Sequence, residues 1–274
     1  MNNPDVKIVI VHYGETDLLF KCLKSLGKIT SYRNVVVSNN NLESLNPFIK
    51  QNFTGVHVVD NSANLGYAGG INSGIRYALN LSPQYILIIT EDTTYEKNFL
   101  TEITQYAAKH RVDIVGPIIK NEKKKIWFDG GEIDRLRYTA GHSSGHLDFI
   151  PGCCKLVRKE VFEEIGILDE RYFIYYEDVD FDLRARKANF SVGIAPKAIV
   201  YHDTYHTNQA YKNMDYYLAR NHFLFLWKLA PLSVKTRELI RLPKTSMNIL
   251  PATNSMHLVD YLIFLEEDLG NEDN

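Results

Sequence analysis

Residues 56–92, VHVVDNSANLGYAGGINSGIRYALNLSPQYILIITED, contain two strand-like segments with a helix-like segment between them. Residues 56–59 and 85–89 are short apolar runs rich in β-branched side chains and bounded by turn residues, which is typical of buried strands. Between the two runs, four apolar residues recur at the spacing of one helix face: Ile71, Ile75, Ala78 and Leu79. The stretch therefore predicts a βαβ unit in a largely parallel sheet that is covered by helices on both faces.

The same alternation continues on both sides of this stretch. Before it we expect strands at 6–11 and 35–37 with a helix around 18–26, and after it a helix at 99–108 and a strand at 114–117. Residues 121–145 lose the pattern and are interpreted as an irregular connection or hairpin near the active face. Regular segments then return as strands at 149–157 and 192–194 and helices at 159–165 and 178–188.

No internal repeat or low-complexity linker divides the chain. We therefore predict one α/β catalytic domain over residues 1–206 and a C-terminal helical appendage over 207–274, packed on the domain or on a partner. Near the start of this appendage, basic residues accompany leucines after Trp227, which suggests peripheral contact with an anionic membrane surface. The alternative is a helical pair that packs on the domain or forms a homodimer, because Pro231 and Pro243 interrupt any long amphipathic helix.

Composition excludes several classes of protein. The 274 residues include 31 basic and 33 acidic side chains, a formal charge of −2, so we expect no nucleic-acid partner. No apolar run approaches the roughly 18 residues of a membrane span, and the first residues lack the features of a signal peptide, so we expect a cytoplasmic protein. Cys22, Cys153 and Cys154 form no C-x-x-C pair and are predicted to be reduced thiols.

Ligands of open parallel sheets bind beyond the carboxyl ends of the strands. Polar residues follow each predicted strand there, and Asp92 is the most informative of them, because hard divalent cations prefer carboxylate oxygens. Asp92 could equally cap the helix that follows it. His202 could complete a metal site or be structural, and Arg220 could contact a phosphate or lie on the surface.

Glu177, Asp178 and Asp180 form the densest acidic cluster of the predicted domain and follow a run of aromatic residues. A carboxylate beside aromatic side chains has a raised proton affinity, as a general base near neutral pH requires. The alternative is a helix start, where the dipole favours acidic side chains. Asp178 and Asp180 diverge by about 200° around a helix, so only one of them can face a given substrate hydroxyl.

Four segments together resemble family 2 glycosyltransferases, in the rhamnosyltransferase-like branch of bacterial polysaccharide enzymes. Residues 64–75, NLGYAGGINSGI, resemble the pattern NLGFAGGNNxGI, and residues 166–181, GILDERYFIYYEDVDF, resemble GxFDExFFxYxEDxDL. Residues 151–158, PGCCKLVR, resemble GAxMLxRR, and residues 200–202 resemble the start of VxHxxG. The resemblance extends over about four fifths of the chain.

This resemblance implies a GT-A fold with a donor half at about 1–120 and an acceptor half at about 121–206. It implies inverting transfer of a sugar from a nucleotide-diphosphate donor, dTDP- or UDP-linked, to a hydroxyl of a glycan or lipid-linked acceptor in surface polysaccharide synthesis. It also implies that Asp178 is the catalytic base, and that Asp92 and His202 hold Mg²⁺ or Mn²⁺. Acceptor-binding residues are then Glu177, Gly152 and Tyr176, and donor-binding residues are His12, Tyr13, Ser38, Asn64, Gly69, Gly70, Asn72 and Arg220.

Two departures from the family pattern bear on the donor site. Ser38 stands where the family usually has an aspartate that recognises the nucleotide base, and the segment TEDTT at 90–94 stands where LNPD or a D-x-D is usual. Two other functions are compatible with the same sheet: a sugar nucleotidyltransferase, and a degenerate carbohydrate-binding or scaffold protein. A nucleotidyltransferase would normally carry a glycine-rich basic loop after its first strand, where this chain has HYGE at 12–15.

Overall fold

The computed structural model describes residues 4–203 and 214–238. The chain divides into two compact units, of which the first takes in Met1–Ile133 and Ala140–Lys212. The second takes in Asp134–Thr139 and Asn213–Asn274. Within the described ranges, no helix has the length and apolar character needed to cross a membrane.

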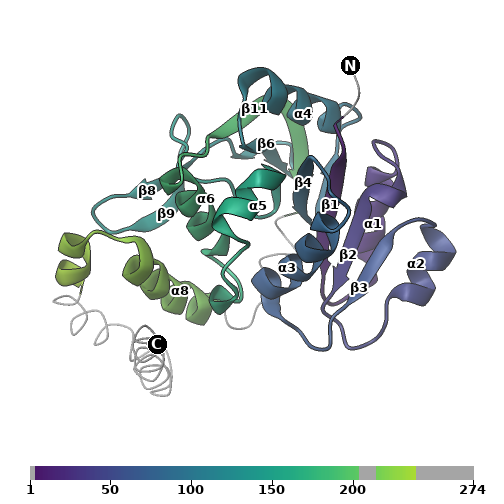
Figure 1. Ribbon diagram of the computed structural model, residues 1–274, viewed down its shortest axis with the longest axis horizontal. Coiled ribbons are helices and arrows are strands. Elements are labelled where there is room, and N and C mark those ends of the chain that lie inside the picture. The colour runs from purple at the N-terminus through teal and green to yellow at the C-terminus, as the bar shows by residue number, and fades with distance from the viewer. Residues whose placement is uncertain (1–3, 204–213, 239–274) are drawn as a thin grey trace. The chain divides into compact units, whose positions relative to one another are not determined.

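The N-terminal half of the first unit is built on four parallel strands, β1 (Val6–His12), β2 (Val35–Asn39), β3 (His57–Asp60) and β4 (Tyr85–Thr90). They lie in the order β3-β2-β1-β4 (Figure 1). Val11 pairs with Thr90 and His12 pairs with Asn39, so the carboxyl ends of three strands meet at one edge of the sheet. The predicted βαβ units are confirmed in this half.

The C-terminal half of the sheet is mixed. β6 (Ile114–Asn121) and β11 (Val192–His202) are parallel, but β10 (Cys154–Arg158) runs antiparallel between β4 and β6. The chain returns from β6 to β10 without a crossover helix and therefore enters β10 from the end where β6 stops. The sequence pattern did not indicate two further short strands. β5 (Thr93–Tyr95) pairs antiparallel with the carboxyl end of β11, and β7 (Ile126–Phe128) pairs antiparallel with the carboxyl end of β6.

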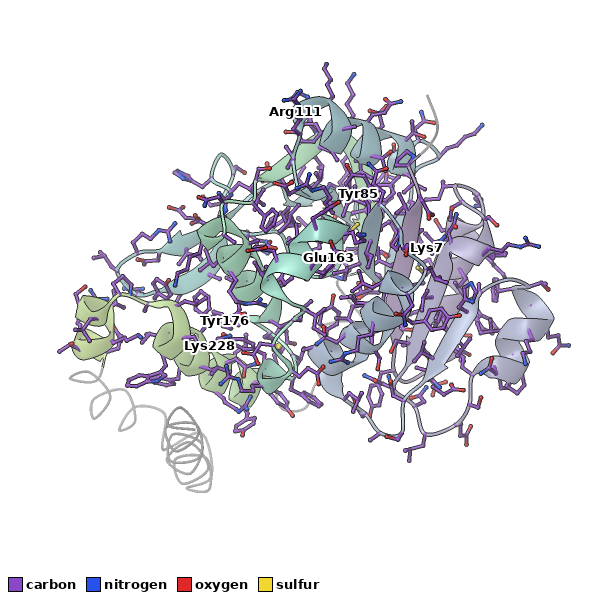
Figure 2. All side chains as sticks on the ribbon, viewed as in Figure 1. Lys7, Tyr85, Arg111, Glu163, Tyr176 and Lys228 are labelled. Carbon is purple, nitrogen blue, oxygen red and sulfur yellow. The ribbon has the colours of Figure 1, made fainter. Side chains whose placement is uncertain are left out.

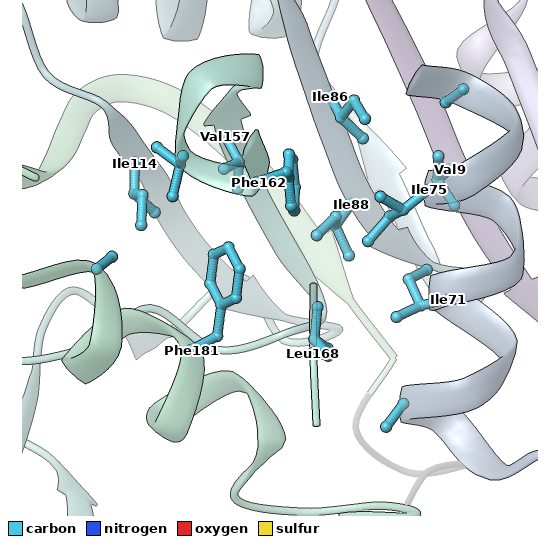
Figure 3. Packing of buried hydrophobic residues seen from close by; sticks show 14 of the residues in the cluster. Val9, Ile71, Ile75, Ile86, Ile88, Ile114, Val157, Phe162, Leu168 and Phe181 are labelled. Atoms are coloured by element: carbon cyan, nitrogen blue, oxygen red, sulfur yellow. The ribbon is translucent and has the colours of Figure 1, made fainter. Parts of the chain in front are cut away.

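Helices cover the sheet, and the α/β class is confirmed. α3 (Gly66–Leu79), α5 (Lys159–Ile165) and α6 (Glu177–Lys187) bury apolar side chains against one face. Figure 3 shows Ile71 and Ile75 of α3 beside Val9 and Ile88, and Phe162 beside Phe181. α1 (Thr16–Leu26) packs against β5, and α4 (Phe99–His110) packs against β6 and β11. The short helices are α2 (Asn46–Asn52), η1 (Tyr32–Asn34) and η2 (Glu170–Tyr172).

Glycines let α3 approach the sheet closely. A Cβ on Gly74 would lie 2.4 Å from Cγ1 of Val9, and a Cβ on Gly70 would lie 2.6 Å from Cγ2 of Val11. Both distances are far below van der Waals contact, so any larger residue would push α3 away from β1. The glycines of the motif NLGYAGGINSGI at 64–75 therefore determine how close α3 lies to the strands that carry the site.

The second unit contains α8 (Met214–Leu229). Tyr138 lies in the turn between β8 (Gly131–Asp134) and β9 (Thr139–His142) and stacks on Phe225 with ring centroids 5.1 Å apart. Its hydroxyl donates a hydrogen bond to the Leu229 carbonyl oxygen at 2.8 Å. α8 lies within the helical appendage expected over residues 207–274. Residues 204–213 and 239–274 of the chain, with most of that appendage, lie outside the described residues.

Candidate functional site

A cavity of about 560 Å³ opens at the carboxyl ends of β1 and β4. Its wall is formed by loops after these strands, by the segment 151–153 before β10, by the start of α6 and by the end of β11. The topology thus brings together residues that lie up to about 190 positions apart in sequence. Seven of the predicted site residues line the cavity: Tyr13, Asn64, Asp92, Gly152, Glu177, Asp178 and His202.

Asp92 and His202 face each other inside this cavity. Asp92 Oδ2 lies 3.1 Å from His202 Nε2, and both side chains are nearly buried, at 12% and 5% exposed. His202 is the last residue of β11, which pairs with β5 directly after Asp92. Because a strand and not a helix follows Asp92, the alternative that Asp92 caps a helix is wrong. The Thr90 hydroxyl donates to the other Asp92 oxygen and fixes the carboxylate.

The Asp92–His202 pair fits a divalent cation. Two neighbouring ligands of an octahedral ion at about 2.1 Å lie about 3.0 Å apart, close to the separation of these two atoms. Among the described residues no group of three or more His, Cys, Asp or Glu side chains is arranged to hold a metal. The protein can therefore offer two ligands here, which suits an ion that takes its remaining ligands from substrate phosphates and water.

His12 lies behind the cavity wall and not in it. The ring is fully buried, with Nδ1 against the Glu91 carboxylate and Nε2 3.2 Å from Asn41 Nδ2. The Asn41 amide is oriented by Gly14, which donates its N–H to Asn41 Oδ1 and accepts from Asn41 Nδ2, both at 3.0 Å. Nε2 of His12 must therefore accept, and Nδ1–H must donate to Glu91. His12 thus supports Glu91 and the loop after β1.

Glu91 also lines the cavity, next to Asp92. Burial raises the pKa of Glu91, and the hydrogen bond from His12 partly opposes this. One of its oxygens is taken by His12.

The three acids at the start of α6 have different surroundings. Asp178 lines the cavity, and its two oxygens accept the backbone N–H groups of Gly152 and Val179, both at 2.8 Å. Asp180 is fully buried and pairs with Arg184 at 2.7 Å, outside the cavity wall. Burial, followed by the charge of Asp178, raises the pKa of Glu177 well above its usual range. Glu177 Oε2 is buried and has no hydrogen-bond partner within the part of the chain that the structure describes.

The other residues predicted to bind substrate do not line the cavity. Asn72 is fully buried and bonds the backbone of Leu168 through both ends of its amide, at 2.8 and 3.1 Å. Ser38 accepts from Asn61 Nδ2 at 3.0 Å. Gly69 and Gly70 lie in α3, and Tyr176, labelled in Figure 2, is the residue before α6. Arg220 belongs to the second unit, on α8, where it donates to the Asn221 side chain at 2.8 Å.

The structure adds residues that sequence reasoning missed. The Tyr67 hydroxyl donates to the Gly152 carbonyl at 2.6 Å, and a Cβ on Gly152 would lie 2.8 Å from that hydroxyl, so only glycine fits between Tyr67 and Asp178. The aromatic position inside NLGYAGG was the available signal for Tyr67. Trp127 of β7 also lines the cavity, and nothing in its irregular sequence context marked it. Lys155 pairs with Asp182 at 2.9 Å beneath the start of α6.

A carboxylate and an imidazole lie at the ends of β4 and β11, and a second carboxylate lies at the start of α6. Together with the sheet, these groups define a GT-A fold glycosyltransferase domain. The chain belongs to Glycosyl transferase family 2, whose family model matches residues 7–166. Its relatives include rhamnosyltransferases, in agreement with the rhamnosyltransferase-like motifs of the sequence.

Two relatives and one solved structure illustrate the likeness. The low-salt glycan biosynthesis hexosyltransferase Agl10 of Haloferax volcanii is 28% identical over 203 residues, 69% of this chain and 64% of that protein. The dTDP-rhamnosyl transferase RfbF of Shigella flexneri is 26% identical over 201 residues, 68% of each chain. The mannosyltransferase PcManGT of Pyrobaculum calidifontis, solved with GDP-Man and Mn²⁺, superimposes with a TM-score of 0.60 at 14% identity, covering 97% of this chain and 80% of that one.

Proposed function

We propose that this protein is an inverting glycosyltransferase that moves a sugar from a nucleotide-diphosphate donor to a hydroxyl group of a glycan or lipid-linked acceptor in bacterial surface polysaccharide synthesis. The names of its relatives, a hexosyltransferase of glycan biosynthesis and a dTDP-rhamnosyl transferase, support a nucleotide-sugar donor and favour dTDP over UDP. We further propose that it acts in the cytoplasm, with peripheral contact to the membrane where a lipid-linked acceptor would lie.

One observation supports this proposal most strongly: Asp92 and Asp178 line the same cavity. The consecutive residues Gly152 and Cys153 connect the two acidic side chains. The Gly152 N–H donates to Asp178 at 2.8 Å, and the Cys153 carbonyl accepts from the Thr90 N–H at 3.1 Å. The end of β4, which carries Asp92, is thereby fixed relative to the start of α6, which carries Asp178. An in-line displacement needs such an arrangement, with the leaving group at one centre and the attacking hydroxyl at the other.

In the proposed reaction, the acceptor oxygen forms a bond to the anomeric carbon while the bond from that carbon to the donor phosphate oxygen breaks. The acceptor proton passes to the Asp178 carboxylate, which is held in place by the N–H groups of Gly152 and Val179. Asp92 and His202 would hold Mg²⁺ or Mn²⁺, and such a cation, when bound, neutralises charge that develops on the departing diphosphate. Tyr67 keeps Gly152 in position under the acceptor side of the cavity.

A transfer assay tests this proposal. The full chain is incubated with Mn²⁺, a lipid-linked or free glycan acceptor and either dTDP-rhamnose or UDP-linked sugars, and release of the nucleoside diphosphate and glycosylation of the acceptor are followed. We expect stoichiometric release and transfer, and a rate at least about 100-fold lower for Asp92→Ala, because a lost electrostatic stabiliser typically costs about 2.7–4 kcal/mol. Release of pyrophosphate from a sugar phosphate and a nucleoside triphosphate would instead identify a nucleotidyltransferase, and binding without turnover would identify a degenerate protein.

A further inference from the structure

The His202 ring is oriented on one side only, by the hydrogen bond between Nε2 and Asp92. A metal-binding histidine usually donates its second ring nitrogen to a carboxylate or carbonyl, and this hydrogen bond fixes the direction of the imidazole. Nε2 of His202 faces Asp92, but Nδ1 is buried and has no hydrogen-bond partner among residues 4–203 and 214–238. A cation held between the two side chains would replace the hydrogen bond from Nε2 to Asp92, so a packing contact must then keep Nε2 turned toward Asp92.

Trp127 supplies the packing contact. Its ring centroid lies 5.0 Å from that of His202, with the two planes inclined by 66°. This edge-to-face arrangement is the one that aromatic rings prefer, and such a pair contributes about 0.5–1.5 kcal/mol beyond its buried area. Trp127 and His202 both line the cavity, so the indole ring packs on the imidazole at the cavity wall.

Two features of the structure place Trp127 beside His202. The pairing of β7 with β6 shifts by one residue, with Phe128 opposite Ile119 and Ile126 opposite Lys120, so Trp127 is the extra residue of a β-bulge. Bulges redirect a side chain and are frequent beside active sites. His142 of β9 then supports the indole ring, because its Nδ1–H donates to the Trp127 carbonyl at 3.0 Å and its ring packs on the indole with centroids 4.5 Å apart.

We propose that Trp127 is a positioning residue of the donor site, whose indole ring holds the His202 imidazole with Nε2 toward Asp92 in place of the hydrogen bond that Nδ1 lacks. This inference rests on the proposed function, because it assumes that Asp92 and His202 receive a divalent cation. It also gives the irregular segment 121–145 a role in positioning a metal ligand, which the sequence pattern of that segment did not indicate.

The test measures binding of Mn²⁺ alone to the full chain, through the electron paramagnetic resonance signal of the free ion. We expect Trp127→Ala to weaken Mn²⁺ binding by about 10- to 100-fold, the usual effect of removing a group that supports a metal ligand. Trp127→Phe, which retains a ring, should keep most of the affinity. The matched control is Trp227→Phe on α8, which changes the second of the two tryptophans and should leave Mn²⁺ binding unchanged.

The variant His202→Ala distinguishes failure of the positioning role of Trp127 from failure of the cation site itself. If His202→Ala loses Mn²⁺ affinity and Trp127→Ala keeps it, the positioning role is overturned and the cation site stands. If His202→Ala itself binds Mn²⁺ like the unchanged protein, the cation site of the proposed function is wrong, and the positioning role is overturned with it. Circular dichroism of each variant checks that the fold is retained.

A second measurement leaves Trp127 in place, in case its replacement prevents folding. In Trp227→Phe, Trp127 is the only tryptophan, and its fluorescence reports directly on the cavity. Paramagnetic Mn²⁺ held by Asp92 and His202 should quench this fluorescence, and the quenching should disappear in Trp227→Phe combined with His202→Ala. Equal quenching in both proteins would show that His202 does not hold the cation, and this would overturn the positioning role of Trp127.

Discussion

Asp178 and Asp180 are two residues apart on α6 and have opposite surroundings. Asp178 faces the cavity with both oxygens held by backbone N–H groups, whereas Asp180 is buried against Arg184 and the Tyr172 hydroxyl. The helix geometry that separates their directions follows from sequence alone. Which of the two faces the cavity is decided by the packing of α6 on the sheet.

We predict that Asp178→Asn transfers sugar about 10²- to 10⁴-fold more slowly than the unchanged protein, because an amide cannot take the acceptor proton. The donor KM should change little, since Asp92 and His202 are untouched. Asp180→Asn should transfer at a near-normal rate but unfold at lower urea concentration, because it weakens the buried contact with Arg184. The reverse pattern, with an active Asp178→Asn and an inactive Asp180→Asn, would place the base on the other side of the helix.

Glu177 makes stability depend on pH. Burial and the Asp178 charge raise its pKa in the folded protein well above the usual 4.5 of a glutamate, so the folded state keeps the proton to a higher pH than the unfolded state. Below pH 4.5 both states are protonated and Glu177 carries no penalty. As the pH rises from about 4.5 to the raised pKa, the unfolded state ionises first, and stability falls by up to about 1.4 kcal/mol per pH unit.

We therefore predict that Glu177→Gln, which cannot ionise, gains stability relative to the unchanged protein as the pH is raised from 4.5 to 8. Urea unfolding at a series of pH values measures this difference. Glu163→Gln is a suitable control, because Glu163 is an exposed acid on α5. A stability difference that is constant over this range would mean that Glu177 ionises alike in both states.

At the scale of elements, α3 is tied to the segment that leads into α6. Asn72 accepts the Leu168 N–H at 3.1 Å and donates to the Leu168 carbonyl at 2.8 Å and to Glu170 at 3.0 Å. Glu170 also pairs with Arg76 of α3 at 2.6 Å, although both side chains are about half exposed and this pair contributes little. The second long motif, at residues 166–181, is thereby held against the first, at residues 64–75.

We predict that Asn72→Ala lowers the free energy of unfolding by about 1–3 kcal/mol for each buried backbone group of Leu168 that it leaves unpaired. Urea unfolding measures the loss. Asn52→Ala provides the control, because Asn52 is exposed on α2 and bonds only a local carbonyl, that of Phe48. Unchanged stability together with a raised donor KM would show instead that Asn72 contacts the donor, as the sequence motif suggested.

At the scale of the whole molecule, a ligand that binds only the folded state raises the temperature of unfolding. We predict that Mn²⁺ with dTDP or UDP stabilises the protein, by about 2.7 kcal/mol when the ligand is at 100 times its Kd. Asp92→Ala should lose this shift, whereas Asp178→Asn should keep it, because only the former removes a cation ligand. A full shift in Asp92→Ala would place the nucleotide elsewhere. Comparing dTDP, UDP and GDP by thermal denaturation identifies the preferred nucleotide.

Local patterns of this chain determined its α/β class and most of its elements. The runs of valine and isoleucine in β1, β2 and β4 and the helical spacing in α1, α3 and α4 are properties of neighbouring residues, which is why a single sequence shows them. The motifs also indicated Asp92, Asp178 and His202, all of which line one cavity. Family membership followed from the same motifs.

Only the tertiary structure decided the direction of β10, the place of His12 behind Glu91 and the part played by Trp127. Each of these depends on residues distant in sequence: β10 pairs with strands that begin 69 and 40 positions earlier, and Glu91 follows His12 by 79 residues. Sequence periodicity reports which side of an element is buried, but not which distant side chain it meets. The contacts that orient the His202 ring and leave Glu177 buried arise when β7, β11 and α6 pack around one cavity.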